Sequence, residues 1–279
     1  MPLWGRPDGL VVTGESRIRR FVPYLMVGRN ESAVYHEQIY DLTRTRPWLR
    51  TWNRAHDQAA TLFHLLLFAY ARVLHERPGL NRFVSGGRLY QRRAVELSFA
   101  AKKSMEPTAP LVTVKVAFPA ADDFAAAVTR IVAAIRDGRS DEEKAVDVEL
   151  KLALALPSPL LRVVMWLLRA LDRWNLLPAA MIRTDPMFAS LFVANLGSVG
   201  LDRTYHHLYE YGNASAFAAI GTAKKAPFVT RAGVVEVRDA IEVRWTFDER
   251  INDGYTSAAA LRLAQQMVED PERYFGAPG

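Results

Sequence analysis

The C-terminal third of the chain alternates short apolar strands with turns and then closes with one amphipathic helix. The helix is expected at 254–269, and Asp253 is placed to cap its N-terminus. A run of strands that ends in a helix restricts the chain to a layered arrangement, because the sheet must bury one face against helices. The expected strands are 189–195, 217–220, 228–231, 234–238 and 240–247.

The N-terminal half supplies the other strands and two long helices. Apolar residues at helical spacing predict helices over 55–75 and 121–136, the second capped by Asp122 or Asp123. Further strands are expected at 33–42, 94–100 and 111–118. The pattern predicts an α/β two-layer sandwich with a mixed sheet in a single domain, over residues 15–272. An N-terminal arm (1–14) and a C-terminal tail (273–279) flank it.

Between about 139 and 187 the chain carries an apolar helical insertion. A first helix is expected at 141–156, a Pro-Ser-Pro sequence breaks it, and a second, very apolar helix covers 160–177. The second helix is amphipathic and too charged to span a bilayer. Its wide apolar face can pack within the protein, roof a channel, or lie on a membrane or a partner. Packing within the protein is the favoured interpretation.

Composition excludes several classes of function. The chain of 279 residues is half hydrophobic and has no cysteine, so disulfides, thiolate nucleophiles and thiolate-bound metals are excluded. The N-terminus lacks the basic and apolar regions of a secretory signal, which favours a cytoplasmic protein. A net charge of +6 admits anionic partners, but the arginines are scattered, so nucleic-acid binding is not expected.

Residues 247–254 read F-D-E-R-I-N-D-G. This segment resembles the D-H-R-x-x-D-G motif of the dihydrolipoyl acyltransferase cores of 2-oxoacid dehydrogenase complexes, whose fold chloramphenicol acetyltransferase shares. In that family the motif His takes the proton from the attacking thiol or hydroxyl. Glu249 stands at that position here.

The resemblance keeps its order from about residue 15 to residue 272. Residues 16–20 resemble an S-R-x-R-R opening, 84–90 an F-x-x-G-x-I-Y turn and strand, and 191–200 the pattern F-T-I-S-N-L-G-x-x-G. It implies the chloramphenicol acetyltransferase fold, assembly of three copies, and coenzyme A as cofactor. It also implies an active site in a channel, where the motif loop of one copy faces the N-L-G strand of its neighbour.

Two departures from the family pattern bear on the chemistry. Glu249 replaces the His, and Ala194 stands where the family's Ser donates a hydrogen bond to the oxyanion. Loss of one such donor costs about 3 kcal/mol in an enzyme that relies on it. No segment upstream could be a lipoyl or subunit-binding domain, because the matching region begins almost at Met1. A stand-alone homologue with an impaired or altered acyl-transfer site is therefore expected.

Glu249 has two interpretations. A carboxylate with an ordinary pKa of about 4.3 is a weaker base than an imidazole at about 6.5, which adds about 3 kcal/mol to proton transfer from a thiol. Burial raises the pKa of a carboxylate and would recover part of that loss. Glu249 is thus either a structural carboxylate, buried or lining the channel and salt-bridged, or a general base. The structural interpretation is favoured.

The candidate site contains Asp253 and Asn195 besides Glu249. In the family the motif Asp pairs with an Arg and holds the loop that carries the base, whereas the capping role of Asp253 would by itself explain the residue here. Asn195 marks the end of a strand that faces the channel. His206 and His207 are either structural or a relocated base for the same channel. Since adjacent side chains of an extended segment point to opposite faces, they are not expected to share a metal.

Positive side chains near the channel are candidates for the phosphates of coenzyme A, although a solvated charge is the default for each. The candidates are Lys102, Lys103, Ser104, Lys224 and Lys225.

The leading hypothesis is a homotrimer that serves as a scaffold or binds an acyl or thioester ligand, without ordinary lipoyl-to-coenzyme-A transfer. Cages are not expected, because Gly and Pro replace the apolar terminus of the family's C-terminal hook in 273–279. The alternative is an active acyl-coenzyme-A-dependent acyltransferase that uses Glu249 or a relocated His on an unknown acceptor. A third hypothesis is a lipid-facing relative that uses the segment 160–177.

Overall fold

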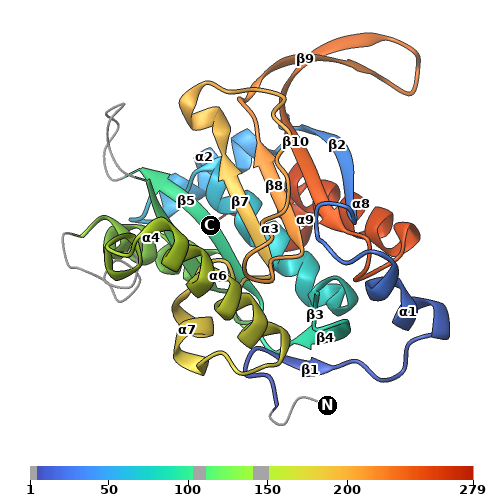
Figure 1. The fold of residues 1–279 in the computed structure, drawn as a ribbon. Helices are drawn as coiled ribbons and strands as arrows, with labels where there is room; N and C mark the ends of the chain where they lie inside the picture. The colour runs from blue at the N-terminus through green and yellow to red at the C-terminus, as the bar shows by residue number, and fades with distance from the viewer. Residues whose placement is uncertain (1–4, 103–110, 141–150, 279) are drawn as a thin grey trace.

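The computed structural model describes residues 5–102, 111–140 and 151–278 (Figure 1). A large mixed sheet runs through the molecule in the order β2-β10-β8-β7-β5-β6, and β9 pairs with the outer part of β10. Neighbours β5, β7 and β8 are parallel, and the other pairs are antiparallel. The strands are β2 (Ala33–Asp41), β5 (Glu96–Lys102), β6 (Leu111–Ala117), β7 (Leu191–Asn195), β8 (Ala216–Ile220), β9 (Lys224–Val229) and β10 (Val235–Asp248).

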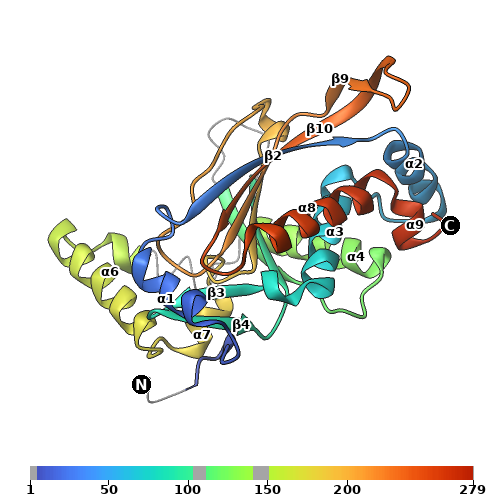
Figure 2. The same ribbon diagram turned by 90° about the vertical axis from the view of Figure 1, so that its right-hand side faces the viewer.

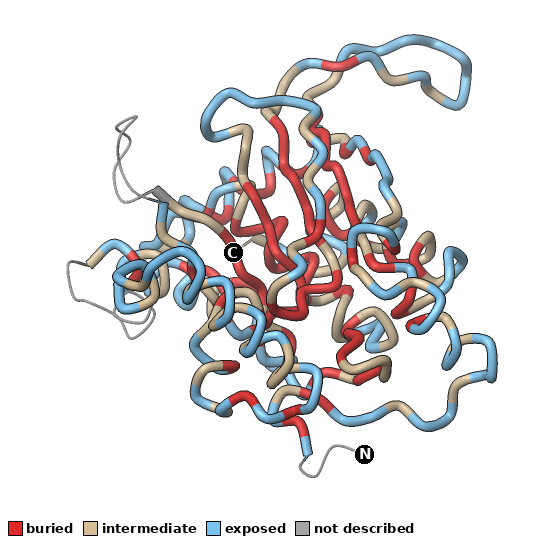
Figure 3. The backbone as a smooth tube through the Cα atoms, viewed as in Figure 1, coloured by how far each residue is buried: buried red, intermediate tan, exposed pale blue. Residues whose placement is uncertain are grey.

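Helices cover one face of this sheet, on the right in Figure 2. They are α2 (Thr45–Ala55), α3 (Leu62–Glu76), α4 (Phe124–Arg139), α8 (Gly254–Glu269) and α9 (Pro271–Phe275). The main apolar core lies between sheet and helices, and α3 contributes an almost unbroken buried run over 64–71. Figure 3 shows the buried residues concentrated in the central strands and the helix behind them. The α/β two-layer sandwich predicted from the sequence is confirmed.

A second, small sheet extends the fold at the N-terminal end, in the order β1-β4-β3. Its strands are β1 (Gly9–Val11), β3 (Arg82–Ser85) and β4 (Arg88–Arg92). Gly86 and Gly87 join β3 to β4 with φ values of 57° and 75°, the left-handed backbone that two-residue hairpins require. Since β1 pairs with β4, part of the N-terminal arm belongs to the folded body. The helix α1 (Arg17–Leu25), which contains most of the S-R-x-R-R segment, then leads into β2.

Several predicted elements differ from the structure. The helix predicted over 55–75 is wrong in its first part: α3 begins only at Leu62, behind a capping box of Thr61 and His64. The side chain of Asn53 binds both backbone groups of Ala60, and this fixes the preceding residues as a loop. The strands predicted at 234–238 and 240–247 are one strand, β10, which continues while its antiparallel neighbour changes from β9 to β2 near Ala240.

The helical insertion lies on the other side of the sheet from α3 and α8 (Figure 2). Its described part contains α6 (Ser158–Arg173) and α7 (Ala179–Thr184), whereas most of the helix expected at 141–156 lies outside the described residues. The helix predicted over 160–177 ends early, because Asn175 takes a positive φ of 58°. Leu168 and Leu171 pack against a small core that includes Phe188.

The apolar face of α6 is only partly covered within one chain. Its outward residues are Leu160, Val163, Trp166 and Leu167, with exposures between 47% and 68%. Packing within the protein therefore accounts for one side of the helix only. No helix in the described ranges has the length and apolar character needed to cross a membrane.

The face of the sheet opposite the helical layer is termed the open face, and the connection 201–215 crosses part of it. Phe192 and Ala194 of β7 and Phe217 and Ala219 of β8 form a small apolar cluster there with Leu208 of the connection. Thr246 of β10 also lies on this face, because it pairs with Phe217 in the ladder.

Candidate functional site

The motif turn follows β10 and is held by a buried ion pair. Asp248 and Arg250 have side chains only 1% and 3% exposed. They form a two-point contact, with Nε–Oδ1 at 2.8 Å and Nη2–Oδ2 at 2.7 Å. The remaining terminal nitrogen of Arg250 donates to the backbone carbonyls of Met26 and Val27 at 3.1 and 2.8 Å. The turn is thus clamped to the segment that connects α1 to β2.

Glu249 stands at the tip of this turn, and its side chain is exposed in the single chain. Its backbone is fixed on both sides: its N–H donates to Ser32 O at 3.0 Å, and Arg19 Nη1 donates to its carbonyl at 3.0 Å. No ion pair within the described chain reaches its carboxylate. Within one chain the carboxylate is therefore neither buried nor salt-bridged, and its place in a channel between copies stays a prediction.

Asp253 caps α8. Its Oδ1 accepts the backbone N–H of Thr256 at 2.7 Å, and the helix begins at Gly254 as predicted. The same hydrogen bond is the main reason why the pKa of Asp253 lies below its ordinary value. No arginine forms an ion pair with Asp253 among the described residues, although the charge of Arg19 acts on it in the same direction. The capping role is confirmed.

Asn195 ends β7, and the chain turns directly into the 3-10 helix η2 (Leu196–Val199). A Cβ on Gly197 would lie 2.2 Å from the carbonyl oxygen of Gly221, so the turn requires glycine here. The hydroxyl of Ser198 donates to Asn195 O at 2.6 Å and is thereby occupied. Ala194, the residue before Asn195, presents no hydroxyl to the open face.

One chain does not bring Glu249 and Asn195 together. Asn195 pairs with Ile220 of β8, and Ile220 pairs with Val243 of β10. Glu249 follows Val243 by six positions along β10, on the order of 20 Å at about 3.3 Å per residue. The two therefore lie at opposite ends of the sheet, and a site containing both needs a second copy of the chain.

His206 lies over the open face, on the side of the sheet that Ala194 occupies. Its ring stacks on Phe217 at 3.9 Å between centroids, and Thr246 donates to its carbonyl at 2.6 Å. The expectation that His206 and His207 point to opposite faces is wrong: their rings stack 4.8 Å apart, since the segment is not an extended strand.

The tautomer of His206 follows from its contacts. Its Nδ1 lies 2.6 Å from the carbonyl oxygen of His207, and a carbonyl can only accept, so Nδ1 carries the proton. Partial burial lowers the pKa of His206, which favours the neutral ring. Nε2 then holds a free lone pair, the form that accepts a proton.

The positive residues proposed for coenzyme A phosphates are engaged with carboxylates where the structure describes them. Lys224 pairs with Asp202 and with Glu242, the latter at 3.1 Å, and Lys225 pairs with Asp239 at 3.2 Å. Lys102 is the last residue of β5, and Lys103 and Ser104 lie outside the described residues.

A buried charged row on β10 was not recognised from the sequence. Burial works to raise the pKa of Glu242, but the hydrogen bond and charge of Lys224 outweigh it and lower that pKa. Arg244 donates to Glu242 at 3.0 Å and is 5% exposed. The period-two spacing of Glu242, Arg244 and Thr246 was the available signal, because alternate residues of a strand share a face. Over the described ranges, no group of three or more His, Asp or Glu could hold a metal ion.

The mixed sheet is covered by helices on one face and has the clamped motif turn at one end and the N-L-G turn at the other, which is the chloramphenicol acetyltransferase-like fold that the resemblance implies. Residues 184–276 match the family described as 2-oxoacid dehydrogenases acyltransferase (catalytic domain). The resemblance stated from the motifs is confirmed in this segment.

Solved structures of similar fold cover almost the whole chain. A probable dihydrolipoamide acetyltransferase from Listeria monocytogenes 4b F2365 matches with a TM-score of 0.59 at 16% identity, over 92% of this chain and 94% of that one. The cubic core of a pyruvate dehydrogenase multienzyme complex matches at 0.58 and 15%, over 94% and 93%. A chloramphenicol acetyltransferase matches at 0.56 and 14%, over 94% and 98%. A comparison with curated proteins found no match. At these identities the structural similarities establish the fold.

Proposed function

We propose that this protein is a homotrimer that binds an acyl group or a thioester at a site shared between copies, without ordinary lipoyl-to-coenzyme-A transfer. The observation that carries the proposal is the contrast at the motif turn. Asp248, Arg250 and Asp253 hold the turn firmly, whereas the position of the family's base is Glu249 and that of its oxyanion donor is Ala194.

Two arguments support a shared site. Glu249 and Asn195 lie at opposite ends of one sheet, so a single chain cannot place both beside one ligand. Glu249 is exposed at the tip of a rigid turn, which is the position from which it could reach a neighbouring copy. Preserved turn geometry with altered chemistry fits ligand binding better than the family's reaction.

Coenzyme A fits the described residues only in part. Its phosphates would need cations, and Lys224 and Lys225 would have to exchange carboxylate partners for phosphate. When bound as a thioester, coenzyme A would supply the acyl group. Asn195 and Glu249 would then contribute polar contacts to the shared site.

The test is an acetyl-coenzyme A assay with dihydrolipoamide as the acceptor, together with calorimetric binding of acetyl-coenzyme A. We expect binding without turnover in the natural chain. The double substitution Glu249→His with Ala194→Ser should introduce turnover, whereas Ala194→Ser alone should not. Turnover by the natural chain that disappears in Glu249→Gln, with assembly unchanged, would refute the proposal and identify Glu249 as a base.

A second candidate function is acyl transfer with His206 as the base. The observation that favours it is the free Nε2 of a neutral His206 on the same face as Ala194. His206→Gln should then abolish any turnover on an alternative acceptor. The matched control is His207→Gln, because the His207 ring stacks on His206, also contacts Tyr209, and donates from Nδ1 to Leu208 O. Equal loss in both variants would argue against a base at 206.

A further inference from the structure

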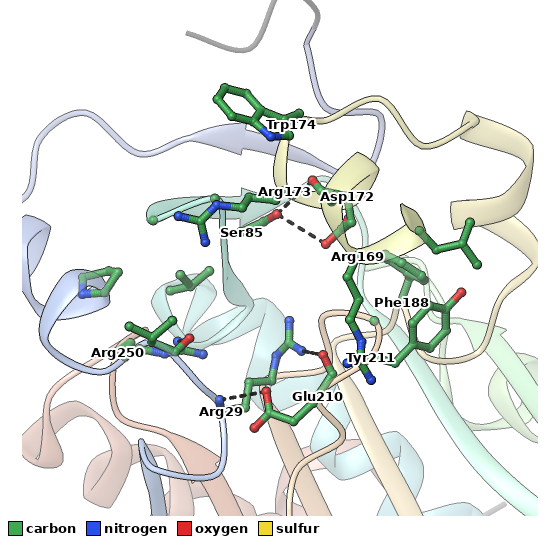
Figure 4. Close-up of a pocket in the computed structure, with 18 of the residues that line it drawn as sticks. Arg29, Ser85, Arg169, Asp172, Arg173, Trp174, Phe188, Glu210, Tyr211 and Arg250 are labelled. Carbon is green, nitrogen blue, oxygen red and sulfur yellow. Dashed lines mark hydrogen bonds between the residues drawn. The ribbon is translucent and has the colours of Figure 1, made fainter. Parts of the chain in front are cut away.

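The insertion helix α6 closes one side of a pocket that the two-layer fold alone would not have. The pocket has a volume of about 570 Å³ and is shown in Figure 4. Its walls come from the connection between α1 and β2, from the Gly86–Gly87 turn, from α6 and from the segment Glu210–Gly212. Arg250 of the motif turn also lines the pocket, so the pocket adjoins that turn.

A buried arginine points into this pocket. Arg29 is 7% exposed, and its Nη1 donates to the backbone carbonyls of Tyr209 and Glu210 at 3.1 and 2.9 Å. Figure 4 shows the other terminal nitrogen directed into the cavity. No carboxylate of the described chain forms an ion pair with this guanidinium. A buried cation without an ionic partner is costly, and burial does lower the pKa of Arg29.

The acidic residues of the pocket are already engaged by other groups. Glu210 accepts the backbone N–H groups of Arg29 and Asn30 and the side-chain amide of Asn30, at 3.0 to 3.3 Å. Asp172 forms an ion pair with the buried Arg6 at 2.8 Å. Neither carboxylate is therefore a free partner for a ligand cation.

Two further arginines line the pocket from α6. Arg169 and Arg173 are exposed side chains, and neither forms an ion pair within the described ranges. In Figure 4 Arg169 extends from α6 toward the segment of Glu210 and Tyr211. Together with Arg29 they supply three guanidinium groups that form no ion pair among the described residues, although the charges of Asp248, Asp172 and Glu210 act on Arg29 from a greater distance. Aromatic and aliphatic side chains, including Trp166 and Phe188, form an apolar part of the wall.

The wall of the pocket is fixed to the rest of the fold. Arg6 donates to Ser85, to the carbonyl of Asp172 and to Asn175, each at 3.2 Å. A Cβ on Gly86 would lie 2.4 Å from the carbonyl oxygen of Arg173, so the glycine turn lets the end of α6 approach closely. The pocket is therefore preformed, which reduces the cost of ordering a ligand site.

We propose that this pocket binds an amphipathic oxyanion, meaning a carboxylate or phosphate head group attached to an aliphatic chain. The head group would sit between Arg29 and the two arginines of α6, because guanidinium groups bind oxyanions through paired hydrogen bonds. The chain would lie against the apolar wall. This inference does not depend on acyl transfer, because binding of the oxyanion to the pocket is measured without turnover.

The test is calorimetric titration of the full chain with octanoate and with octyl phosphate, and with 1-octanol as the uncharged control. We expect at least one anion to bind, and 1-octanol to bind at least about tenfold more weakly. The stronger of the two anions then identifies the head group. Failure of both anions to bind up to about 1 mM, or equal binding of 1-octanol, would overturn the proposal.

Variants on α6 locate the binding. Arg169→Ala with Arg173→Ala should weaken anion binding by about tenfold or more, and the fold should survive because both side chains are exposed. The matched control is Arg162→Ala, an exposed arginine of the same helix that does not line the pocket, and it should change binding less than about twofold. Equal effects of the double variant and the control would show that binding occurs elsewhere.

Discussion

At the scale of single residues, the pair formed by Asp248 and Arg250 sets the position of the motif turn. Both charges are withdrawn from water, and their mutual contact and the carbonyls of Met26 and Val27 satisfy them. Burial of such a pair costs desolvation free energy. Removal of one partner costs more, because it leaves the other charge buried alone. This ion pair therefore explains why Asp248 and Arg250 are needed in the motif, whatever residue stands at position 249.

Asp248→Ala should lower the free energy of unfolding by about 3–5 kcal/mol, because Arg250 would remain buried without its carboxylate. Denaturant unfolding followed by circular dichroism measures this loss. The control is Arg44→Ala, which breaks the pair with Asp270 in which the arginine side chain is 72% exposed. It should cost less than about 1 kcal/mol. Similar losses in the two variants would contradict the assignment of Asp248 as a buried anchor.

His64 should make the stability depend on pH. Its Nδ1 accepts the N–H of Thr61 at 3.0 Å, and burial lowers the pKa of His64. A proton on Nδ1 would remove that acceptor. The stabilisation by the neutral ring is fully present above the unfolded pKa of about 6.5 and is lost as the pH falls through the lower pKa of the folded state.

His64→Gln should keep the cap, because glutamine offers an oxygen acceptor at the same position, and should remove this pH dependence. The melting temperature of the natural chain should fall more steeply than that of the variant between about pH 8 and pH 5. Parallel curves for the two proteins would show that His64 does not titrate on unfolding.

At the scale of elements, α6 is a helix whose apolar face is only partly covered within one chain. Its amphipathic pattern predicted a helix with one apolar face, and the helix is present. The pattern could not predict what covers that face, because periodicity shows which residues share a face of the helix and not which element packs against it. Within one chain only the side near Leu168 and Leu171 is packed.

Val163→Ser should change the free energy of unfolding by no more than about 0.5 kcal/mol, since Val163 is 57% exposed. Leu177→Ala, at a residue that is 5% exposed in the small core beside α6, should cost about 2–5 kcal/mol. Thermal or denaturant unfolding measures both. A large loss in Val163→Ser would show that another copy of the chain covers this face of α6.

At the scale of the whole molecule, the proposed site requires more than one copy. Size-exclusion chromatography with light scattering should give a mass three times the 31.4 kDa of one chain. The expectation rests on the placement of Glu249 and Asn195 at opposite ends of the sheet, which only a neighbour can bring together. A mass of one chain would refute the shared site, and a mass near 24 copies would refute the expectation that cages do not form.

Much of the fold could be predicted because its signals are local. The closing helix at 254–269, the cap at Asp253 and the turn at Gly86–Gly87 each depend on a few neighbouring residues, and all three are confirmed. The start of α3 was predicted wrongly, because Asn53 and Ala60 fix the loop through contacts that hydrophobic spacing does not record. The stacking of His206 on His207 was missed for the same reason, since the His206 ring is held on Phe217, which is distant in sequence.

The sequence by itself determined most strands of the large sheet, the class of fold and the identity of the residues in the motif turn, because periodicity, capping and turn chemistry act over short stretches of chain. Only the tertiary structure decided that Arg29 lies beneath α6 and that Glu249 and Asn195 are far apart in one chain. Those relations join residues from distant segments. They arise from the burial of apolar surface and of charge throughout the molecule, which no local pattern contains.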